Sequence, residues 1–184
     1  PLGAYPDSWS PDGKYVLCDK NGGPRTKVDL WVLPMDGTEP FTYYATEFEE
    51  GHAQFSPDGR WVAYTSNELG RPEIYIQSFP IGNGKWQIST AGGDQVQWRN
   101  DKELFYIGVD NSLMAVSINV TGSGIDASKP VLLFPTTAPQ GGITDDRNNF
   151  APSADGKRFL INTLTNASNL QPLTLVINWH GEMK

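Results

Sequence analysis

Three polar residues stand at the same distance before an aromatic residue in different parts of the chain. His52, Gln95 and Arg147 each precede an aromatic side chain by three positions. An imidazole, an amide and a guanidinium bind ligands through hydrogen bonds, and arginine also binds through its charge. If each residue enters a strand that lines one channel, all three lie at its rim. They are our candidate ligand-binding residues, with a water-filled polar channel as the alternative.

A catalytic role for these residues is not supported by the sequence. His52 has no base paired with it, so we expect a solvated or channel-lining histidine. The chain lacks the Gly-rich loop, strand lysine and Asp-Asn set of protein kinases, and it lacks the G-x-S-x-G elbow of serine hydrolases. We therefore predict no catalytic residue here and place any activity of the parent protein in a separate domain.

Metal coordination is also disfavoured. One aspartate recurs in each of four turns, at positions 12, 58, 101 and 155. These aspartates belong to different turns, so they cannot share one ion. Asp145 and Asp146 form the one acidic pair that suits a hard cation, and solvated loop charge is the default for such a pair. His180 has no partner at metal-ligand spacing. We expect no metal site and no cofactor.

The turns that would position the candidate residues repeat along the chain. Ser10–Gly13 and Ser56–Gly59 both read Ser-Pro-Asp-Gly, with weaker copies at 153–156 and 99–102. Proline presets φ for the first corner, aspartate tolerates the second, and glycine takes the left-handed position that follows. Such turns close β-hairpins. Aromatic residues precede the turns at positions 9, 55, 98 and 150, at intervals of 46, 43 and 52 residues.

Short strands with period-two alternation fill each repeat. In the clearest one we expect strands at 52–56, 61–66, 73–79 and 85–90. Repeats of this length with four strands are typical of propeller blades rather than of a sandwich. The predicted fold class is all-β: a β-propeller of four-stranded antiparallel blades, with about four blades, near 5–46, 52–91, 95–134 and 149–179. The connections 119–129 and 135–148 carry no strand signal.

Composition agrees with an all-β protein and limits its partners. The 184 residues include 19 Gly, 14 Pro and abundant aromatic residues, and no long segment has a helical period. The formal charge of −7 without a basic run argues against nucleic acid or an anionic membrane as partner. No apolar run approaches the roughly 18 residues of a membrane span. Cys18 is the single cysteine, so no internal disulfide forms, and we expect it in the core.

The fourth predicted blade has three strands, which leaves an edge unpaired. Propellers close by letting one blade take strands from both ends of the chain. Pro1–Ala4 stands before the first blade, and it is poor strand material. We therefore interpret the chain as the C-terminal part of a larger propeller. A closed four-bladed propeller is the alternative, and open blade edges would also permit self-association.

Two segments carry a resemblance to a known family. Trp9-Ser-Pro-Asp-Gly-Lys-Tyr-Val-Leu and Phe55-Ser-Pro-Asp-Gly-Arg-Trp-Val-Ala resemble the WD40-like (PD40) repeats of TolB-type β-propellers. Glu73–Pro80, Gly84–Gly93 and the closing Leu175–Trp179 are similar to the C-terminal propeller of bacterial, acidobacterial-type serine/threonine protein kinases and winged-helix regulators. The resemblance covers nearly the whole chain. It departs at the third turn, which has lost proline and glycine, so we expect a looser hairpin there.

The resemblance implies a non-enzymatic module that binds a protein or small molecule at the channel or rim. Such a module would be the sensor or interaction region of a larger bacterial signalling protein, outside the cytoplasm in many relatives. We expect no nucleic-acid partner and no membrane contact within the chain. One alternative is the gating propeller of a prolyl-oligopeptidase-type hydrolase. Another is a propeller lactonase with a channel metal, which the scarcity of histidine disfavours.

Overall fold

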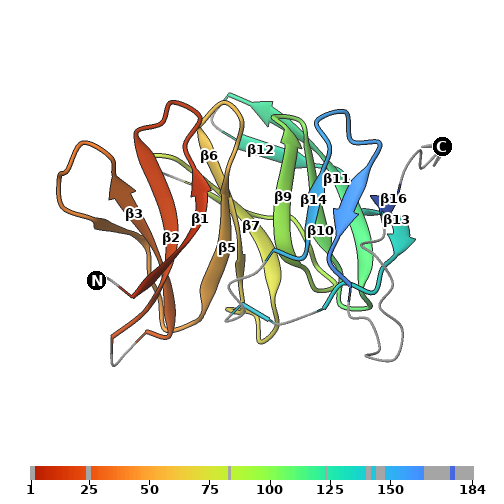
Figure 1. The fold of residues 1–184 in the computed structure, drawn as a ribbon, viewed down its shortest axis with the longest axis horizontal. Helices are drawn as coiled ribbons and strands as arrows, with labels where there is room; N and C mark the ends of the chain where they lie inside the picture. Colours follow the sequence, from red (N-terminus) through yellow and green to blue (C-terminus); the bar gives the residue numbers. More distant parts are fainter. Residues whose placement is uncertain are drawn as a thin grey trace.

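The computed structural model describes residues 3–23, 26–82, 84–122, 124–139, 142–143, 148–163 and 175–176. Within these ranges the chain consists of strands, turns and irregular segments, without a helix. The strands form four antiparallel sheets that stand side by side, as Figure 1 shows. The predicted all-β fold class with four-stranded antiparallel blades is confirmed.

The first two sheets are four-stranded and follow chain order. The first contains β1 (Ala4–Trp9), β2 (Tyr15–Asn21), β3 (Val28–Pro34) and β4 (Phe41–Tyr44). The second contains β5 (Glu50–Phe55), β6 (Trp61–Ser66), β7 (Glu73–Ser78) and β8 (Lys85–Gln87). We call these sheets the first and second blades.

The third and fourth blades are less regular. The third contains β9 (Asp94–Asn100), β10 (Glu103–Ile107), β11 (Ser112–Thr121), β12 (Gly124–Ala127) and β13 (Val131–Pro135). The fourth contains β14 (Phe150–Pro152), β15 (Phe159–Ile161) and β16 (Leu175–Val176). Both β12 and β13 pair with β11, at different segments of that long strand.

The connection predicted at 119–129 contains a strand pair. β11 continues to Thr121 and turns back into β12, with Val120 opposite Ile125. Ile125 is buried, and Val120 packs against the apolar cluster between the second and third blades. The burial of these alternating apolar residues outweighs the low strand propensity of the surrounding glycines and serines.

The Ser-Pro-Asp-Gly turn is held by its own side chains. Ser56 Oγ donates to Asp58 Oδ1 at 2.6 Å and accepts the Trp61 N–H at 3.0 Å. Asp58 Oδ1 also accepts the Arg60 N–H at 3.1 Å, and Gly59 has φ +71°. Left-handed backbone costs a glycine little because it has no Cβ. The motif therefore fixes the hairpin between β5 and β6.

The third turn is tighter than we predicted. Asn100 pairs directly with Glu103, so Asp101 and Lys102 form a two-residue loop. Asn100 Oδ1 accepts the Lys102 N–H at 2.8 Å. Asp101 Oδ1 accepts the backbone N–H of Asp58 at 2.8 Å, which ties this turn to that of the second blade. The expected looser hairpin is wrong, because asparagine bonds to its own turn in place of proline and glycine.

Three apolar clusters fill the spaces between neighbouring blades. Leu17, Leu30, Val62 and Tyr64 belong to the cluster between the first and second blades. Ile74, Val96 and Leu104 belong to the next cluster, and Phe105 and Phe159 to the third. Each large side chain buried here contributes about 1.5–3 kcal/mol to folding. The blades are thus held to one another by apolar packing on both sides.

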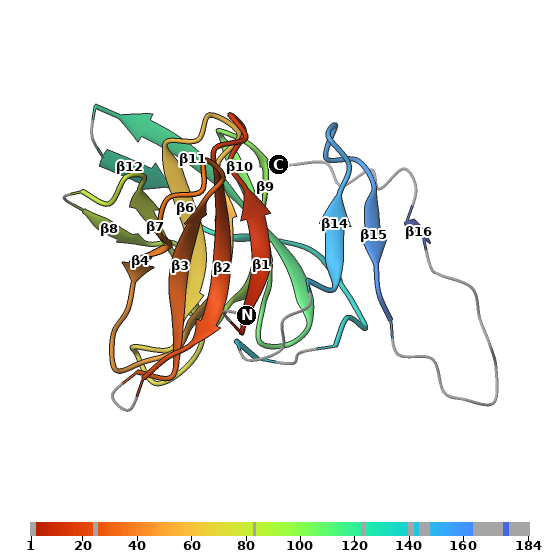
Figure 2. The same ribbon diagram turned by 60° about the vertical axis from the view of Figure 1, so that its left-hand side comes forward.

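The two edges of the blades differ in their connections. The hairpins with Asp-Gly turns lie at the upper edge in Figures 1 and 2, where β1 and β14 end. The opposite edge carries the loops 67–72 and 108–111 and the inter-blade connector 88–93. We call this opposite edge the connector face. Each blade begins and its second hairpin turns there, so residues from neighbouring blades meet on it.

Candidate functional site

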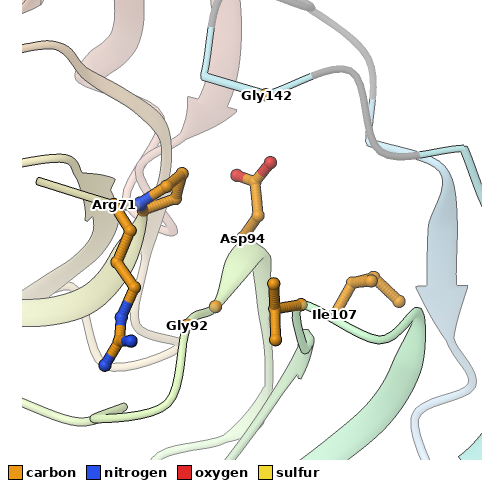
Figure 3. A pocket seen from close by; sticks show the side chains of 8 residues that line it. Arg71, Gly92, Asp94, Ile107 and Gly142 are labelled. Carbon is orange, nitrogen blue, oxygen red and sulfur yellow. The ribbon is translucent and has the colours of Figure 1, made fainter.

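A pocket of about 230 Å³ lies on the connector face where the second and third blades meet. Figure 3 shows it from close by. Its walls come from the start of β7, the start of β9, the end of β10 and the loop after β13: Arg71, Pro72, Gly92, Gly93, Asp94, Ile107, Val109 and Gly142. Segments far apart in the sequence therefore build one small site.

The buried carboxylate of Glu73 fixes the connector that forms one wall. Its Oε1 accepts the Gly92 N–H at 3.0 Å and the Arg71 Nε–H at 2.7 Å, and its Oε2 accepts the Ser89 hydroxyl. Ser89 Oγ in turn accepts the Ile74 N–H at 2.8 Å. A connector with this many bonds to β7 has a defined shape.

Two glycines let the connector pass close to its neighbours. Gly92 has φ +92°, which side chains rarely adopt. A Cβ on Gly93 would lie 2.9 Å from both Ser89 Oγ and Tyr106 Cδ2. Larger residues at these positions would displace the wall of the pocket, so the Gly-Gly pair has a steric reason.

Asp94 places a carboxylate in this pocket. Its Oδ1 lies 2.7 Å from His52 Nδ1 and accepts the Gln95 N–H at 2.8 Å. Because an ionised carboxylate only accepts, the Nδ1 of His52 carries the shared hydrogen. Neither of these bonds uses Oδ2. Asp94 is 6% exposed, and in Figure 3 its carboxylate points toward Gly142 across the pocket.

The structure places His52 away from solvent. It is 0% exposed, with φ +54°, and its backbone N–H donates to Asp19 Oδ2 at 3.1 Å. The expectation of a solvated or channel-lining histidine is wrong. Gly51 before it is equally confined, since a Cβ there would lie 2.8 Å from Ile143 Cγ2. His52 is buried because its ring bonds to the next blade instead of to water.

Gln95 occupies the corresponding position in the third blade. It is also fully buried and has φ +56°. Its Oε1 accepts the Asn149 N–H at 2.7 Å, and its Nε2 donates to Pro139 O at 3.2 Å. Asn162 Nδ2 continues the network to Asn149 Oδ1 at 2.9 Å. Gln95 thus binds the third blade to the fourth.

The three predicted site residues therefore differ in outcome. His52 and Gln95 share one structural position and contact Asp94 from both sides, but their polar atoms bond within the protein. Arg147 lies outside the described residues. A ligand-binding role for the three stays a prediction. Asp94 and Arg71 were missed, and the available signal was the Gly92-Gly93-Asp94 run directly before Gln95.

Other sequence predictions concern single residues. Cys18 is buried as expected, and burial first, then the charges of Asp7 and Asp19, raise the pKa of its thiol to about 11. Among the residues that the structure describes, no group of three His, Cys, Asp or Glu side chains is placed to hold a metal ion. Asp145, Asp146 and His180 lie outside those residues. Within the same ranges, we find no helix with the length and hydropathy of a membrane span.

Comparisons with known proteins place the fold. No protein-family model matches the chain. Over 79 residues it is 34% identical to the Tol-Pal system protein TolB of Pseudomonas aeruginosa, which covers 43% of this chain and 18% of TolB. Over 57 residues it is 35% identical to Tricorn protease homolog 1 of Streptomyces coelicolor, or 31% of this chain and 5% of that protein. The chain thus spans less than a fifth of either relative.

A solved structure extends the likeness to most of the chain. The crystal structure of TolB from Acinetobacter baumannii matches with a TM-score of 0.58 at 17% identity, over 85% of this chain and 36% of that one. The fold is a TolB-like β-propeller. In this propeller the pocket beside Asp94 lies between two adjacent blades on the connector face.

Proposed function

We propose that this propeller is a non-enzymatic binding module in which one group of a partner enters the pocket beside Asp94. The observation that carries the proposal is a pocket built by two blades and shaped by the bonds of Glu73. A fixed pocket reduces the ordering cost of binding. Its place on the connector face leaves it open to a large partner.

The size of the pocket favours a partner that inserts a single group. About 230 Å³ corresponds to roughly eight water molecules at about 30 Å³ each. Sites for whole drug-sized ligands span about 300–1,000 Å³. We therefore expect one side chain of a protein or peptide to enter, while the rest of the partner lies on the surrounding connector face.

The setting of the module follows from its relatives. We propose that it is the sensor or interaction region of a larger bacterial signalling protein that carries a kinase or winged-helix domain. The sequence resemblance to kinase-linked propellers supports this setting. We also propose a location outside the cytoplasm, which is supported by the periplasmic location of TolB homologues.

A peptide-binding assay tests the proposal. Random peptides displayed on phage are selected on the immobilised chain and then titrated against Val109→Trp and Leu69→Trp. Val109 lines the pocket and is 68% exposed, so tryptophan there fills the pocket without changing the core. Leu69 is 61% exposed on a neighbouring loop and provides the matched control. Selected peptides should lose at least about tenfold in affinity with Val109→Trp only. Equal binding to all three proteins, or no selected peptide, would overturn the proposal.

A second candidate is the gating propeller of a prolyl-oligopeptidase-type hydrolase. The local identity to Tricorn protease homolog 1 favours it. This candidate expects the intact parent protein to cleave short chromogenic peptides, with a rate that Val109→Trp changes by altering entry. The propeller alone should show no cleavage. A parent that binds the selected peptides and leaves them intact would exclude it.

A further inference from the structure

The pocket beside Asp94 has one polar feature that selects the chemistry of its ligand. We propose that it takes a cationic group on a short apolar stem, the side chain of a lysine or arginine on a partner protein. This inference rests on the proposed function and names the class of group that enters the pocket. It follows from the hydrogen bonds, the charges and the walls of the site.

The first observation is the carboxylate oxygen Oδ2 of Asp94. Both hydrogen bonds to this side chain, from His52 and from the Gln95 backbone, reach Oδ1. Oδ2 has no hydrogen-bond partner among the described residues, although the side chain is 91% buried. A nearly buried carboxylate oxygen without a donor is unfavourable. A ligand that donates to Oδ2 removes this cost, so the site is prepared for a donor.

The second observation is that the nearby arginine does not neutralise this carboxylate. Arg71 donates through Nε to Glu73 and through Nη2 to the Thr90 carbonyl at 2.6 Å. In Figure 3 its guanidinium points away from Asp94. Within the described part of the chain, His52 is the one ion-pair partner of Asp94. The pocket thus keeps negative charge, which favours a cation and repels a carboxylate.

The third observation is the character of the walls. Ile107, Val109 and Pro72 contribute apolar side chains, and glycines at 92, 93 and 142 contribute none. The alkyl part of a lysine or arginine packs on such walls while its charged end reaches a polar partner. The low dielectric beside buried Ile107 strengthens an ion pair with Asp94 relative to one on the open surface.

Three small probes test the inference by NMR titration of the ¹⁵N-labelled chain. The N-acetyl N-methylamides of lysine, norleucine and glutamate offer a cationic, a neutral and an anionic end on similar stems. The lysine probe should shift the amide signals of Gly92, Gly93 and Ile107, with an affinity at least about tenfold above that of norleucine. Higher salt should weaken the lysine probe and leave norleucine unchanged.

Asp94→Asn is the matched variant. The amide oxygen of asparagine still accepts from His52 and from the Gln95 N–H, while its NH₂ group replaces Oδ2 in the pocket. The preference for lysine over norleucine should disappear. Asp110→Asn removes a charge next to Val109 without changing the lining and should keep the preference. If Asp94→Asn does not fold, the three probes on the unaltered chain still decide.

The outcomes separate this inference from the proposed function. Equal binding of lysine and norleucine, abolished by Val109→Trp, would overturn the cationic ligand and leave the binding pocket in place. A stronger glutamate probe would likewise overturn it. If no probe and no selected peptide produces a shift that Val109→Trp removes, both the inference and the proposed function fail.

Discussion

His52 Nδ1 in the second blade lies 2.7 Å from Asp94 Oδ1 in the third, and both side chains are almost completely shielded from water. This hydrogen bond joins two blades at the base of the candidate site. It also sets the orientation of the Asp94 carboxylate, so that Oδ1 is occupied and Oδ2 faces the pocket. Stability and ligand binding therefore depend on the same contact.

Replacing His52 should test how much this contact stabilises the fold. In His52→Ala, Asp94 loses a buried donor and a cavity replaces the ring, which should lower the free energy of unfolding by about 2–4 kcal/mol. His52→Asn should cost less, because asparagine tolerates φ +54° and its amide can donate toward Asp94. Urea denaturation measures both variants. Equal stability of the two would show that the hydrogen bond contributes little.

Gly59 tests the turn between β5 and β6. Gly59→Ala should destabilise the protein by about 1–2 kcal/mol, because its φ of +71° brings a side chain into an unfavourable region and 3.1 Å from Pro11 Cγ. Gly37→Ala shares the left-handed φ but meets no atom within 4 Å, so it separates the backbone cost from the contact. Gly23→Ala has neither feature and should be nearly neutral. Thermal unfolding followed by circular dichroism ranks the three, and equal costs at 59 and 23 would contradict the turn geometry.

Glu50 should make stability fall as the pH rises. Burial raises the pKa of its carboxyl above the usual 4.5, although hydrogen bonds from Thr46 and Ser66 oppose this. The folded state then holds the proton more tightly than the unfolded chain. Its contribution is fully present below pH 4.5 and is lost as the pH rises through the higher folded pKa. Each unit of pKa difference corresponds to about 1.4 kcal/mol.

Glu50→Gln removes this titration and is the comparison to make. The free energy of unfolding of the unaltered protein, relative to Glu50→Gln, should decline between pH 4.5 and neutrality. Urea titrations at several pH values give both curves under the same conditions. A difference that rises with pH would mean that the hydrogen bonds at Glu50 outweigh its burial.

Lys85 should stabilise the contact between the first and second blades. Its ammonium lies 4.1 Å from the ring centroid of Tyr75, near Tyr44 and Tyr64, and pairs with Glu68. Lys85→Met keeps the apolar stem and removes the charge, which should cost about 1–2 kcal/mol in urea denaturation. Glu68→Gln keeps the ring contacts and should cost less. A methionine variant as stable as the unaltered chain would show that the ammonium is fully offset by its desolvation.

The fold was predictable because its signals are local. The Pro-Asp-Gly turn and the alternation of strands such as Trp61–Ser66 depend on neighbouring residues, so the sequence predicts them directly. The pairing of β12 was missed because Gly122 and Gly124 resemble a loop, and only packing of Ile125 on another blade favours a strand. Tertiary burial outweighed local propensity there.

The site was predictable in position and not in environment. Spacing from the aromatic residues located His52 and Gln95 at equivalent places, but it gave no sign that their side chains turn into the protein. The partner of His52 is Asp94, 42 residues away in the chain. Such a pair forms only when two blades are docked, so a pattern within one repeat cannot reveal it.

The left-handed backbone at His52 and Gln95 has a consequence for engineering repeat proteins from this chain. Valine, isoleucine and threonine, which favour strands elsewhere, are poorly tolerated at φ near +55°. A consensus blade built from average strand preferences would place such residues here and strain every repeat. A library restricted to Gly, Asn, Asp, His and Gln at this one position would keep successive blades interchangeable, and the choice among the five would set how strongly each blade adheres to the next.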